Sequence, residues 1–413
     1  MRCYDIAVVG GGPAGAMAAI RAKEHKRGVV LIERNNSIGK KLLLTGKGRC
    51  NISNSAPIDV FLEKFGRQGP FYRTAFGAFS SQDLADFFES RGLKFKIERQ
   101  GRIFPVTDSS ESVAKTLKES LASKGVEMLY NMRLSGLKKR DSAFKLDFEG
   151  RPSIAARRVI LSTGGSSYRS TGSTGDGFRI AEKLGHTILP ITPALVPLTA
   201  KEKWLKGLSG LTLKNVRLTF LIGKKKVTTG IGECLFTHFG VSGPLVLDIS
   251  GRIVSMMEKF KTAQLLIDLK PALSEDKLEA RLLREFQDSG NKDIKNIMGS
   301  LVPQRLGEAF LKMARIGPGK KCNQVTQKER SALITLFKSL TLTVTGSLPV
   351  EEAMVTDGGV STKEIDPKTM ESRIVPGLYF AGEIIDGSAP SGGYSLQQAF
   401  STGYLAGEKA ASA

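Results

Sequence analysis

The chain has 413 residues, of which 41% are hydrophobic and 24% charged, a composition typical of a globular protein with two or three domains rather than one core. No stretch reads as a membrane span, and Gly10–Pro13 interrupts the apolar opening in a way that argues against a signal peptide. The formal net charge of +21, from 61 Lys and Arg against 40 Asp and Glu, would attract a polyanion, for which RNA is the first candidate.

The basic residues are dispersed along the chain. They gather only in short clusters such as Lys138–Arg140, Lys224–Lys226 and Lys320–Lys321, without an RNP-like or zinc-finger motif. The charge therefore also fits a solvated basic face that has no nucleic-acid partner. Four scattered cysteines without a CxxC pair predict neither a metal site nor a disulfide framework, and they favour the reducing cytoplasm.

The first 33 residues predict a strand, a glycine turn, a helix and a second strand. In the spacing Gly10-x-Gly12-x-x-Gly15, Gly10 permits the tight turn, Gly12 lets the backbone approach a pyrophosphate, and Gly15 lets the helix pack on the strand. An Ala-rich helical stretch follows this turn up to about Lys23, and its N-terminus would face the phosphates. An ordinary glycine turn of an α/β domain is the simpler interpretation.

The second strand, residues 28–32, ends in Glu33. A carboxylate at this position accepts hydrogen bonds from the adenosine ribose and would repel a 2′-phosphate. Further on, residues 155–161 predict a strand that returns to the nucleotide sheet, and the alternating runs 126–130 and 144–148 resemble a β-meander. We therefore expect a nucleotide-binding domain over residues 1–193 that resumes at 343–413.

The segment between these parts changes character twice. Short alternating runs over residues 194–272 predict a β-barrel-like substrate domain. Residues 273–342 instead show helical periodicity and begin with Ser274, a good helix start, which predicts a small helical subdomain.

The C-terminal part resembles the second nucleotide fingerprint of two-dinucleotide-binding flavoproteins. Residues 373–382 read as a strand that ends in Ala-Gly, and the acid that follows, Glu383, would bond the ribityl chain of FAD. A terminal helix starting after Gly392-Gly393 would direct free N–H groups at the flavin. Only one clear GxGxxG is present, so NAD(P)H, if it is used, must bind transiently in the substrate cleft.

Six further blocks carry a resemblance that runs almost from end to end. The chain resembles the BaiN/RdsA-type bacterial flavoproteins, which are NAD(P)/FAD-dependent oxidoreductases. The blocks are Gly39–Asn54, Gly101–Pro105, Leu161–Tyr168, Thr171–Gly177, Leu235–Pro244 and Thr356–Val360. Three positions depart from the family pattern: Lys47 replaces glycine, Arg169 replaces proline, and Ser395 replaces asparagine.

The resemblance implies a Rossmann-like FAD-binding α/β domain with an inserted barrel-like domain and a helical subdomain. It also implies FAD as the cofactor, with NAD(P)H as a transient electron donor. The motifs and the resemblance together assign cofactor binding to Gly10, Gly12, Pro13, Ala14, Gly15, Glu33, Arg34, Lys41, Gly48, Arg49, Asn51, Thr163, Gly164, Gly382, Glu383, Asp386, Gly392, Gly393, Tyr394 and Ser395.

Two residues are candidate proton donors for the reduction. Cys50, beside Lys47 and Arg49, could have a lowered thiol pKa, although a buried structural cysteine fits the same glycine loop. His238, in the predicted barrel, could reach the substrate, although a lone histidine in an apolar run is more often a core residue.

Family members have proposed roles in reducing uridine of large-subunit ribosomal RNA to dihydrouridine, in bile-acid metabolism and in amine oxidation. The charge favours the RNA role, so we expect a cytoplasmic rRNA dihydrouridine-forming reductase with RNA as partner and neither membrane nor metal. The alternatives are a small-molecule flavin oxidase or reductase with an amine or steroid-like substrate, and a non-enzymatic RNA-binding protein. The oligomeric state stays open.

Overall fold

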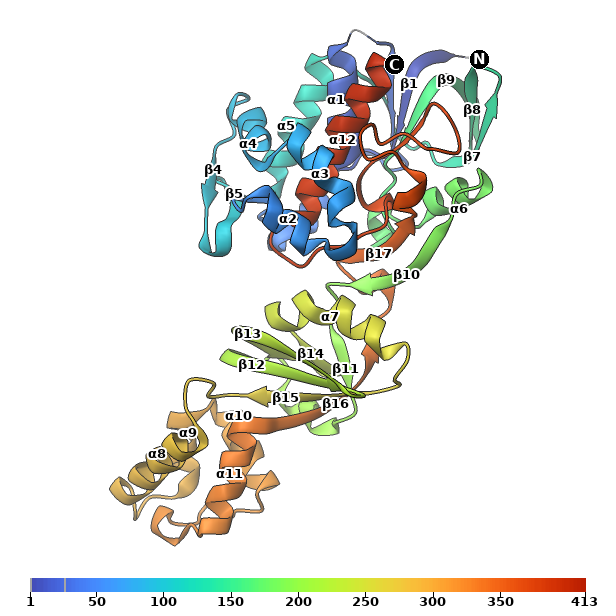
Figure 1. Cartoon of the computed structure of the whole chain (residues 1–413). Coiled ribbons are helices and arrows are strands. Elements are labelled where there is room, and N and C mark those ends of the chain that lie inside the picture. The colour runs from blue at the N-terminus through green and yellow to red at the C-terminus, as the bar shows by residue number, and fades with distance from the viewer. Residues whose placement is uncertain (1, 26) are drawn as a thin grey trace. The chain divides into compact units, whose positions relative to one another are not determined.

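The computed structural model describes residues 2–25 and 27–413 and divides the chain into two compact units (Figure 1). Unit 1 takes in the chain up to Ala194 together with Pro349–Ala413, and unit 2 is Leu195–Leu348. Each unit has a hydrophobic core of its own. Within the described ranges, no helix combines the length and the apolarity needed to cross a bilayer.

Unit 1 is built on a twisted, mostly parallel sheet. Its parallel strands run in the order β6, β2, β1, β9, with β18 beside the end of β9, and β7 and β8 add an antiparallel meander to the other half of β9. The bounds are β1 (Cys3–Val9), β2 (Val29–Ile32), β6 (Glu127–Leu129), β7 (Leu134–Arg140), β8 (Ala143–Phe148), β9 (Arg151–Leu161) and β18 (Leu378–Phe380).

The strand near residue 128 is not part of the meander, contrary to our expectation. It pairs in parallel with β2. The chain between β2 and β6 includes the helix α5 (Ser110–Ser123), and a crossover that contains a helix lets two strands of one sheet run in the same direction. The meander consists instead of β7, β8 and β9.

The remaining elements of unit 1 surround this sheet. The helices are α1 (Pro13–Glu24), α2 (Ile58–Lys64), α3 (Gly69–Ala78), α4 (Ser81–Glu89), α6 (Asp176–Lys183) and α12 (Tyr394–Ser412). Two small sheets pair β3 (Ser53–Asn54), β5 (Arg102–Pro105) and β4 (Phe95–Ile97), and β10 (Ile188–Ala194) with β17 (Val355–Val360).

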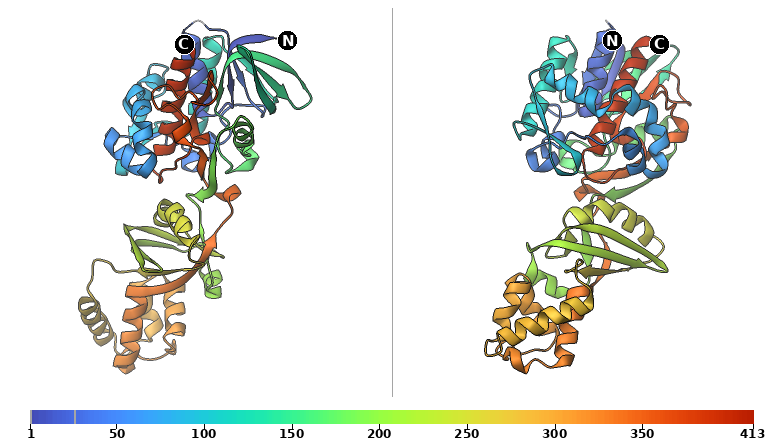
Figure 2. Two further views of the ribbon diagram at one scale, coloured as in Figure 1. Left: turned by 45° about the vertical axis from the view of Figure 1, so that its right-hand side comes forward. Right: turned by 60° about the vertical axis from the view of Figure 1, so that its left-hand side comes forward.

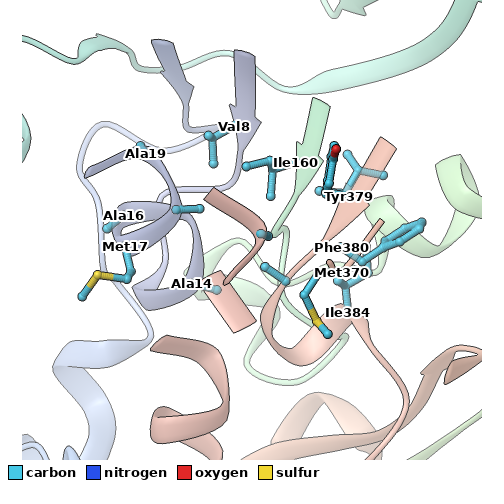
Figure 3. Close-up of a cluster of buried hydrophobic side chains, with 14 of the residues drawn as sticks. Val8, Ala14, Ala16, Met17, Ala19, Ile160, Met370, Tyr379, Phe380 and Ile384 are labelled. Atoms are coloured by element: carbon cyan, nitrogen blue, oxygen red, sulfur yellow. The ribbon is translucent and has the colours of Figure 1, made fainter. Parts of the chain in front are cut away.

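Helices α1 and α12 lie side by side, in blue and red in Figures 1 and 2. Glycines of α12 allow this contact, because a Cβ added at Gly403 would lie 2.2 Å from the Ala14 carbonyl oxygen, and one at Gly407 would lie 2.3 Å from that of Ala18. Ala16 and Ala19 of α1 belong to the same buried hydrophobic cluster as Val8 and Ile160 of the sheet (Figure 3). The close packing brings the C-terminal segment to the N-terminal turn.

Unit 2 contains a closed antiparallel barrel, in the strand order β11, β14, β13, β12, β15, β16. The bounds are β11 (Leu198–Ala200), β12 (Thr212–Ile222), β13 (Lys225–Phe236), β14 (Gly240–Ser242), β15 (Ala263–Asp268) and β16 (Leu340–Ser347). We expected the nucleotide-binding domain to resume at residue 343, but β16 instead closes the barrel by pairing with both β11 and β15.

The helices of unit 2 are α7 (Pro244–Met257), α8 (Glu275–Asp288), α9 (Ile294–Leu301), α10 (Gln304–Met313) and α11 (Gln327–Ser339). Ser274 caps α8 by accepting a hydrogen bond from the Lys277 N–H at 3.3 Å, the start expected from the sequence. The fold class, a Rossmann-type α/β domain with a barrel and a helical region, is confirmed.

Candidate cofactor-binding site

A large pocket of unit 1 opens at the carboxyl ends of β1 and β2, between the N-termini of α1 and α12. Ligands commonly bind at this edge in parallel α/β sheets. The expected cofactor residues that line the pocket are Gly10, Gly12, Pro13, Ala14, Glu33, Arg34, Lys41, Thr163, Gly164, Gly382, Glu383 and Ser395. Residues from both ends of the chain thus share one cavity.

The three glycines of the turn differ in whether the protein itself leaves room for a side chain. Gly10 has a φ of +108°, and a Cβ on Gly15 would lie 1.8 Å from the Gly10 carbonyl oxygen, so both glycines are required by the chain's own atoms. Gly12 differs, because a Cβ there would meet no atom of the described residues within 4 Å. The space beside Gly12 is therefore free for a ligand at the N-terminus of α1, where phosphate binds well.

Glu33 is held rigidly at the end of β2. Its Oε2 accepts a hydrogen bond from the Gly11 N–H at 2.7 Å, and its Oε1 accepts two from Asn35, one from the backbone and one from the side chain, both at 2.8 Å. Each carboxylate oxygen can accept more than one hydrogen bond. These three bonds fix the orientation of the buried Glu33 carboxylate in the lining of the pocket.

Arg34 joins the end of β2 to the loop before α6. Its Nη1 donates to Thr174 Oγ1 at 2.6 Å and to Asp176 Oδ2 at 3.0 Å, and Asp176 also accepts from Arg133 Nε at 2.8 Å. Burial alone would raise the pKa of Asp176, but hydrogen bonding to Arg133 and the charges of Arg133 and Arg179 lower it below its ordinary value. The ionised cluster fixes one wall of the pocket.

Lys41 and Glu383 form an ion pair that also lines the pocket. The Lys41 Nζ lies 2.7 and 2.9 Å from the two carboxylate oxygens and donates to Ser167 Oγ at 2.6 Å. Glu383 also accepts from the Thr356 N–H at 2.8 Å. Burial opposes ionisation of Glu383, but the charge and hydrogen bond of Lys41 lower its pKa. Both side chains are about one-fifth exposed, so a ligand can still reach them.

The N-terminus of α12 points its first turn into the pocket. Ser395 and Leu396 line the cavity, and the first N–H groups of a helix have no partner within the helix. Among the described side chains, Thr163 Oγ1 and Ser395 Oγ are buried without a hydrogen-bond partner. Since buried polar atoms are nearly always hydrogen-bonded, these two hydroxyls mark positions where a bound group would supply the missing partner.

Several expected cofactor residues lie behind the pocket. With its amide in the orientation that satisfies its neighbours, Asn51 donates to the Ser53 carbonyl at 3.0 Å and accepts from the Gly393 N–H at 3.0 Å. The Gly392 carbonyl accepts from Asn54 Nδ2, also at 3.0 Å. Tyr394 packs edge-on against Phe61 at a centroid distance of 4.9 Å. Asn51 and the two glycines therefore hold the start of α12 in position.

Arg49 turns away from the pocket. Its guanidinium bonds Glu98 and Asp108, with Nε 2.9 Å from Asp108 Oδ1, and lies over the Phe104 ring at 4.2 Å. The hydrogen bonds to Glu98 and Asp108 raise its pKa. Gly48, which has a φ of +86°, likewise does not line the cavity.

Cys50 is fully buried, which favours the structural cysteine over the thiol with a lowered pKa, the two interpretations that the sequence left open. Burial raises its pKa to about 12, outweighing a hydrogen bond with Thr45. The guanidinium of the neighbouring Arg49 pairs with the carboxylates of Glu98 and Asp108. A thiol with this pKa is protonated at neutral pH and gives up its proton reluctantly.

Asp386 and His238 occupy different surroundings. Asp386 is buried, accepts from Gln68 Nε2 at 2.7 Å, and has a pKa raised by burial in spite of this hydrogen bond. His238 belongs to unit 2, where it is exposed between β13 and β14, next to the ring of Phe239. It is therefore not the core histidine of the simpler interpretation.

Several residues that line the pocket were not predicted from the sequence. Met132 and Arg133 lie in the chain between β6 and β7, Leu134 begins β7, and Gln398 lies in the second turn of α12. Gln398 also donates to the Gly382 carbonyl at 3.2 Å. None belongs to a recognisable short motif, so only the folded structure identifies them.

The features of the pocket fit FAD. A helix N-terminus beside the open Gly12 suits a pyrophosphate, Glu33 suits an adenosine ribose, and Glu383 suits a ribityl chain. The second helix N-terminus and the orphaned Ser395 hydroxyl suit the polar edge of a flavin.

Comparisons with known proteins agree with this geometry. Residues 4–409 match the family described as HI0933-like protein Rossmann domain. The chain is 32% identical over 408 residues to the 3-dehydro-bile acid delta(4,6)-reductase of Clostridium scindens, which covers 98% of each chain. It is 30% identical over 412 residues to the ribosomal RNA dihydrouridine synthase of Escherichia coli, covering 98% of this chain and 97% of the relative.

Solved structures with similar folds include a 3-ketosteroid delta1-dehydrogenase from Sterolibacterium denitrificans, with a TM-score of 0.56, 13% identity and full coverage of both chains. A flavocytochrome c3 fumarate reductase has a TM-score of 0.53 and 16% identity, covering 100% of this chain and 78% of that one. At these identities the likeness concerns the fold alone.

Proposed function

Since the chain belongs to the HI0933-like Rossmann-domain family and is an FAD-dependent oxidoreductase, we propose that it reduces uridine of ribosomal RNA to dihydrouridine, with NAD(P)H as electron source. The family resemblance seen in the sequence is confirmed. FAD, when bound, supplies the redox chemistry between an electron donor and the substrate, and the protein supplies binding, orientation and protons.

The names of the relatives point to one reaction class. A delta(4,6)-reductase and a dihydrouridine synthase both add hydrogen across a carbon–carbon double bond. In uridine this bond is C5=C6, conjugated with the C4 carbonyl, so saturation consumes two electrons and two protons. The reaction therefore needs a proton donor near the substrate, in addition to the cofactor.

The distribution of charge supports RNA as the substrate. Unit 2 carries 25 Lys and Arg against 13 Asp and Glu, a net +12 over 154 residues, whereas the remainder carries 36 against 27, a net +9 over 259 residues. The basic excess per residue is thus about twice as high in unit 2. A neutral or anionic small molecule does not require a field spread over a whole domain, but a polyphosphate does.

We assign the proton-donor role to His238 in preference to Cys50. The His238 side chain is exposed, so a substrate can reach it, whereas the Cys50 thiol is buried and has a pKa raised to about 12. Cys50→Ala should leave turnover nearly unchanged, and His238→Gln should lower it by about 10²-fold if the imidazole donates the proton. Equal, small effects of both substitutions would remove both residues from the catalytic list.

The decisive experiment combines genetics with purified enzyme. Large-subunit rRNA from a deletion strain, digested to nucleosides and measured by mass spectrometry, should lack dihydrouridine that returns on complementation with the wild-type gene. The FAD-loaded enzyme should form dihydrouridine in an unmodified rRNA transcript under anaerobic conditions, with NADH and NADPH compared as donors. Unchanged dihydrouridine in the deletion strain would contradict the proposal. Action on rRNA also requires the cytoplasmic location that we propose.

A small-molecule reductase is the alternative, favoured by the 32% identity to the bile-acid enzyme. Two assays of the FAD-loaded enzyme test it. The NAD(P)H-reduced enzyme is offered a 3-oxo steroid with a conjugated double bond, and the oxidised enzyme is offered an amine, with oxygen as the electron acceptor and hydrogen peroxide as the product. Turnover of either compound at a rate unaffected by RNA, together with no product from the rRNA transcript, would favour this function.

A further inference from the structure

A hairpin tip and a helix end meet on the surface of unit 2. The turn Gly223-Lys224 joins β12 to β13, and Gly223 takes a φ of +56°, as the first residue of such a turn often does. Phe260 follows the end of α7 and lies over this turn, because a Cβ added at Gly223 would be 2.6 Å from its ring. Figure 1 shows α7 beside this hairpin.

This contact gathers lysines from two distant segments around one aromatic ring. We define the hairpin-tip patch as Lys224, Lys225, Lys226, Lys259, Phe260 and Lys261, all of them exposed. The ring of Phe260 remains 42% exposed, and no ion pair to any of the five lysines is found among the described residues. Glu258 is the carboxylate next to the patch in sequence, and it is also exposed.

The arrangement is electrostatically unfavourable unless an anionic partner binds to it. Five like charges on a hairpin and the adjoining loop repel one another, and one nearby carboxylate does not neutralise them. A single exposed apolar residue is ordinary on a protein surface, but an aromatic face among unpaired lysines combines the two groups that bind an unpaired nucleic-acid strand. Lysines neutralise phosphates, and the ring stacks on a base.

We propose that the hairpin-tip patch binds an unpaired strand of RNA, with a base stacked on Phe260 and phosphates held by the lysines. The proposal rests on RNA as the substrate class proposed above. An anionic membrane surface is the competing occupant, but a single partly exposed ring offers little apolar area to bury in lipid. The patch is too small to bind duplex RNA by shape, so unpaired RNA is the expected partner.

Binding of the FAD-loaded full chain to a fluorescent oligouridylate of about 12 nucleotides tests the proposal. Phe260→Leu keeps an apolar side chain over Gly223 and should weaken binding about tenfold by removing the stacking surface, whereas Phe260→Trp should bind at least as tightly as the wild type. The triple variant K224Q/K225Q/K226Q should reduce the slope of log K against log salt by about 2, for three lost contacts to a single strand.

The matched control removes the same charge elsewhere in unit 2. Lys277, Lys292 and Lys312 are exposed lysines outside the patch, so K277Q/K292Q/K312Q should change the affinity much less than the patch triple. Equal losses from both triples would overturn the proposal, since overall charge would then explain binding. Equal binding by Phe260→Leu and wild type, or binding of phosphatidylserine vesicles in preference to the oligouridylate, would also overturn it.

The two proposals can fail separately. If the patch variants lose oligouridylate binding while the deletion strain keeps its rRNA dihydrouridine, the RNA site stands and the proposed reaction fails. If the deletion strain loses dihydrouridine and the patch variants restore it with unchanged RNA affinity, the reaction stands and the patch proposal fails.

Discussion

We expect Gly12 to be required for cofactor binding but not for folding. Its φ of −77° suits any residue, and no atom lies within 4 Å of an added Cβ. Gly12→Ala should therefore leave the free energy of unfolding of the cofactor-free protein within about 0.5 kcal/mol of wild type. It should lower FAD affinity tenfold or more, because the added methyl group would occupy the space that the pyrophosphate needs. Titration with FAD, followed by flavin fluorescence, measures the loss.

Gly15→Ala is the matched control, because its Cβ would lie 1.8 Å from the Gly10 oxygen. This variant should be destabilised even without FAD. A stable Gly15→Ala protein, or a Gly12→Ala protein that binds FAD normally, would refute the division of roles between the two glycines.

The Lys41–Glu383 ion pair should make the stability of the protein depend on pH. The pKa of Glu383 lies below its ordinary 4.5, so the stability that ionised Glu383 contributes is present above pH 4.5 and is lost as the pH falls through the lowered pKa. Lys41→Met leaves a partly buried carboxylate without its cation and should cost about 1–3 kcal/mol at neutral pH.

In Lys41→Met the pKa of Glu383 should rise, so the cost should shrink toward about pH 5 as the carboxylate takes up a proton. Urea unfolding of the cofactor-free proteins at both pH values measures it. The double variant K41M/E383Q should recover most of the loss, and a penalty that grows on acidification would contradict this account.

His186 provides a second pH-dependent contribution. It is buried against Phe380, with its Nε2 2.8 Å from Ser372 Oγ, and burial lowers its pKa from 6.5. The unfolded chain therefore binds the proton more readily, and stability should fall as the pH drops below about 6.5. His186→Gln should flatten the dependence of the free energy of unfolding on pH between about 6.5 and 5, as measured by urea unfolding across this range.

At the scale of elements, the pairing of α1 with α12 assembles the pocket. Gly403→Ala places a Cβ 2.2 Å from the Ala14 carbonyl oxygen, and it should cost about 1–3 kcal/mol although alanine favours helices. Gly299 in α9 meets no atom within 4 Å, so Gly299→Ala should be neutral or stabilising by up to about 1 kcal/mol. Thermal unfolding compares the two, and FAD retention should fall only for Gly403→Ala.

The sequence predicted correctly those features that depend only on residues close together in the chain. The turn at Gly10–Gly15, Glu33 at a strand end, and Ser274 at a helix start belong to this kind. Contacts between distant segments could not be predicted. Arg49 stands beside Cys50 in sequence but pairs with Glu98 and Asp108 in space, so the sequence alone could not decide between a thiol with a lowered pKa and a structural cysteine.

The same reason explains what the sequence missed in the site and in the barrel. Lys41, Ser167 and Glu383 meet across more than 300 residues of chain, and no spacing rule connects them. The strand β16 looks like the start of the returning domain, because a short apolar alternation does not reveal which sheet it joins. The roles of the expected cofactor residues stay predictions until FAD binding is measured.

For the whole molecule, two separate cores predict two unfolding events. The pocket lies wholly in unit 1, so FAD at about 100 times its dissociation constant should stabilise that unit by about 2.7 kcal/mol and leave unit 2 unchanged. Differential scanning calorimetry with and without FAD should show one transition that shifts and one that does not. A single transition that moves as a whole would show instead that the units unfold together.

The interruption of unit 1 by unit 2 also imposes an order on biosynthesis. The pocket needs the glycine turn near residue 10, Glu383, and the first turns of α12 up to Ala399. During translation, the N-terminal residues of the pocket therefore lack their C-terminal partners until the whole of unit 2 has been synthesised. Cofactor loading becomes a late, post-synthetic event, and a ribosome that stalls before residue 399 releases a chain unable to retain flavin.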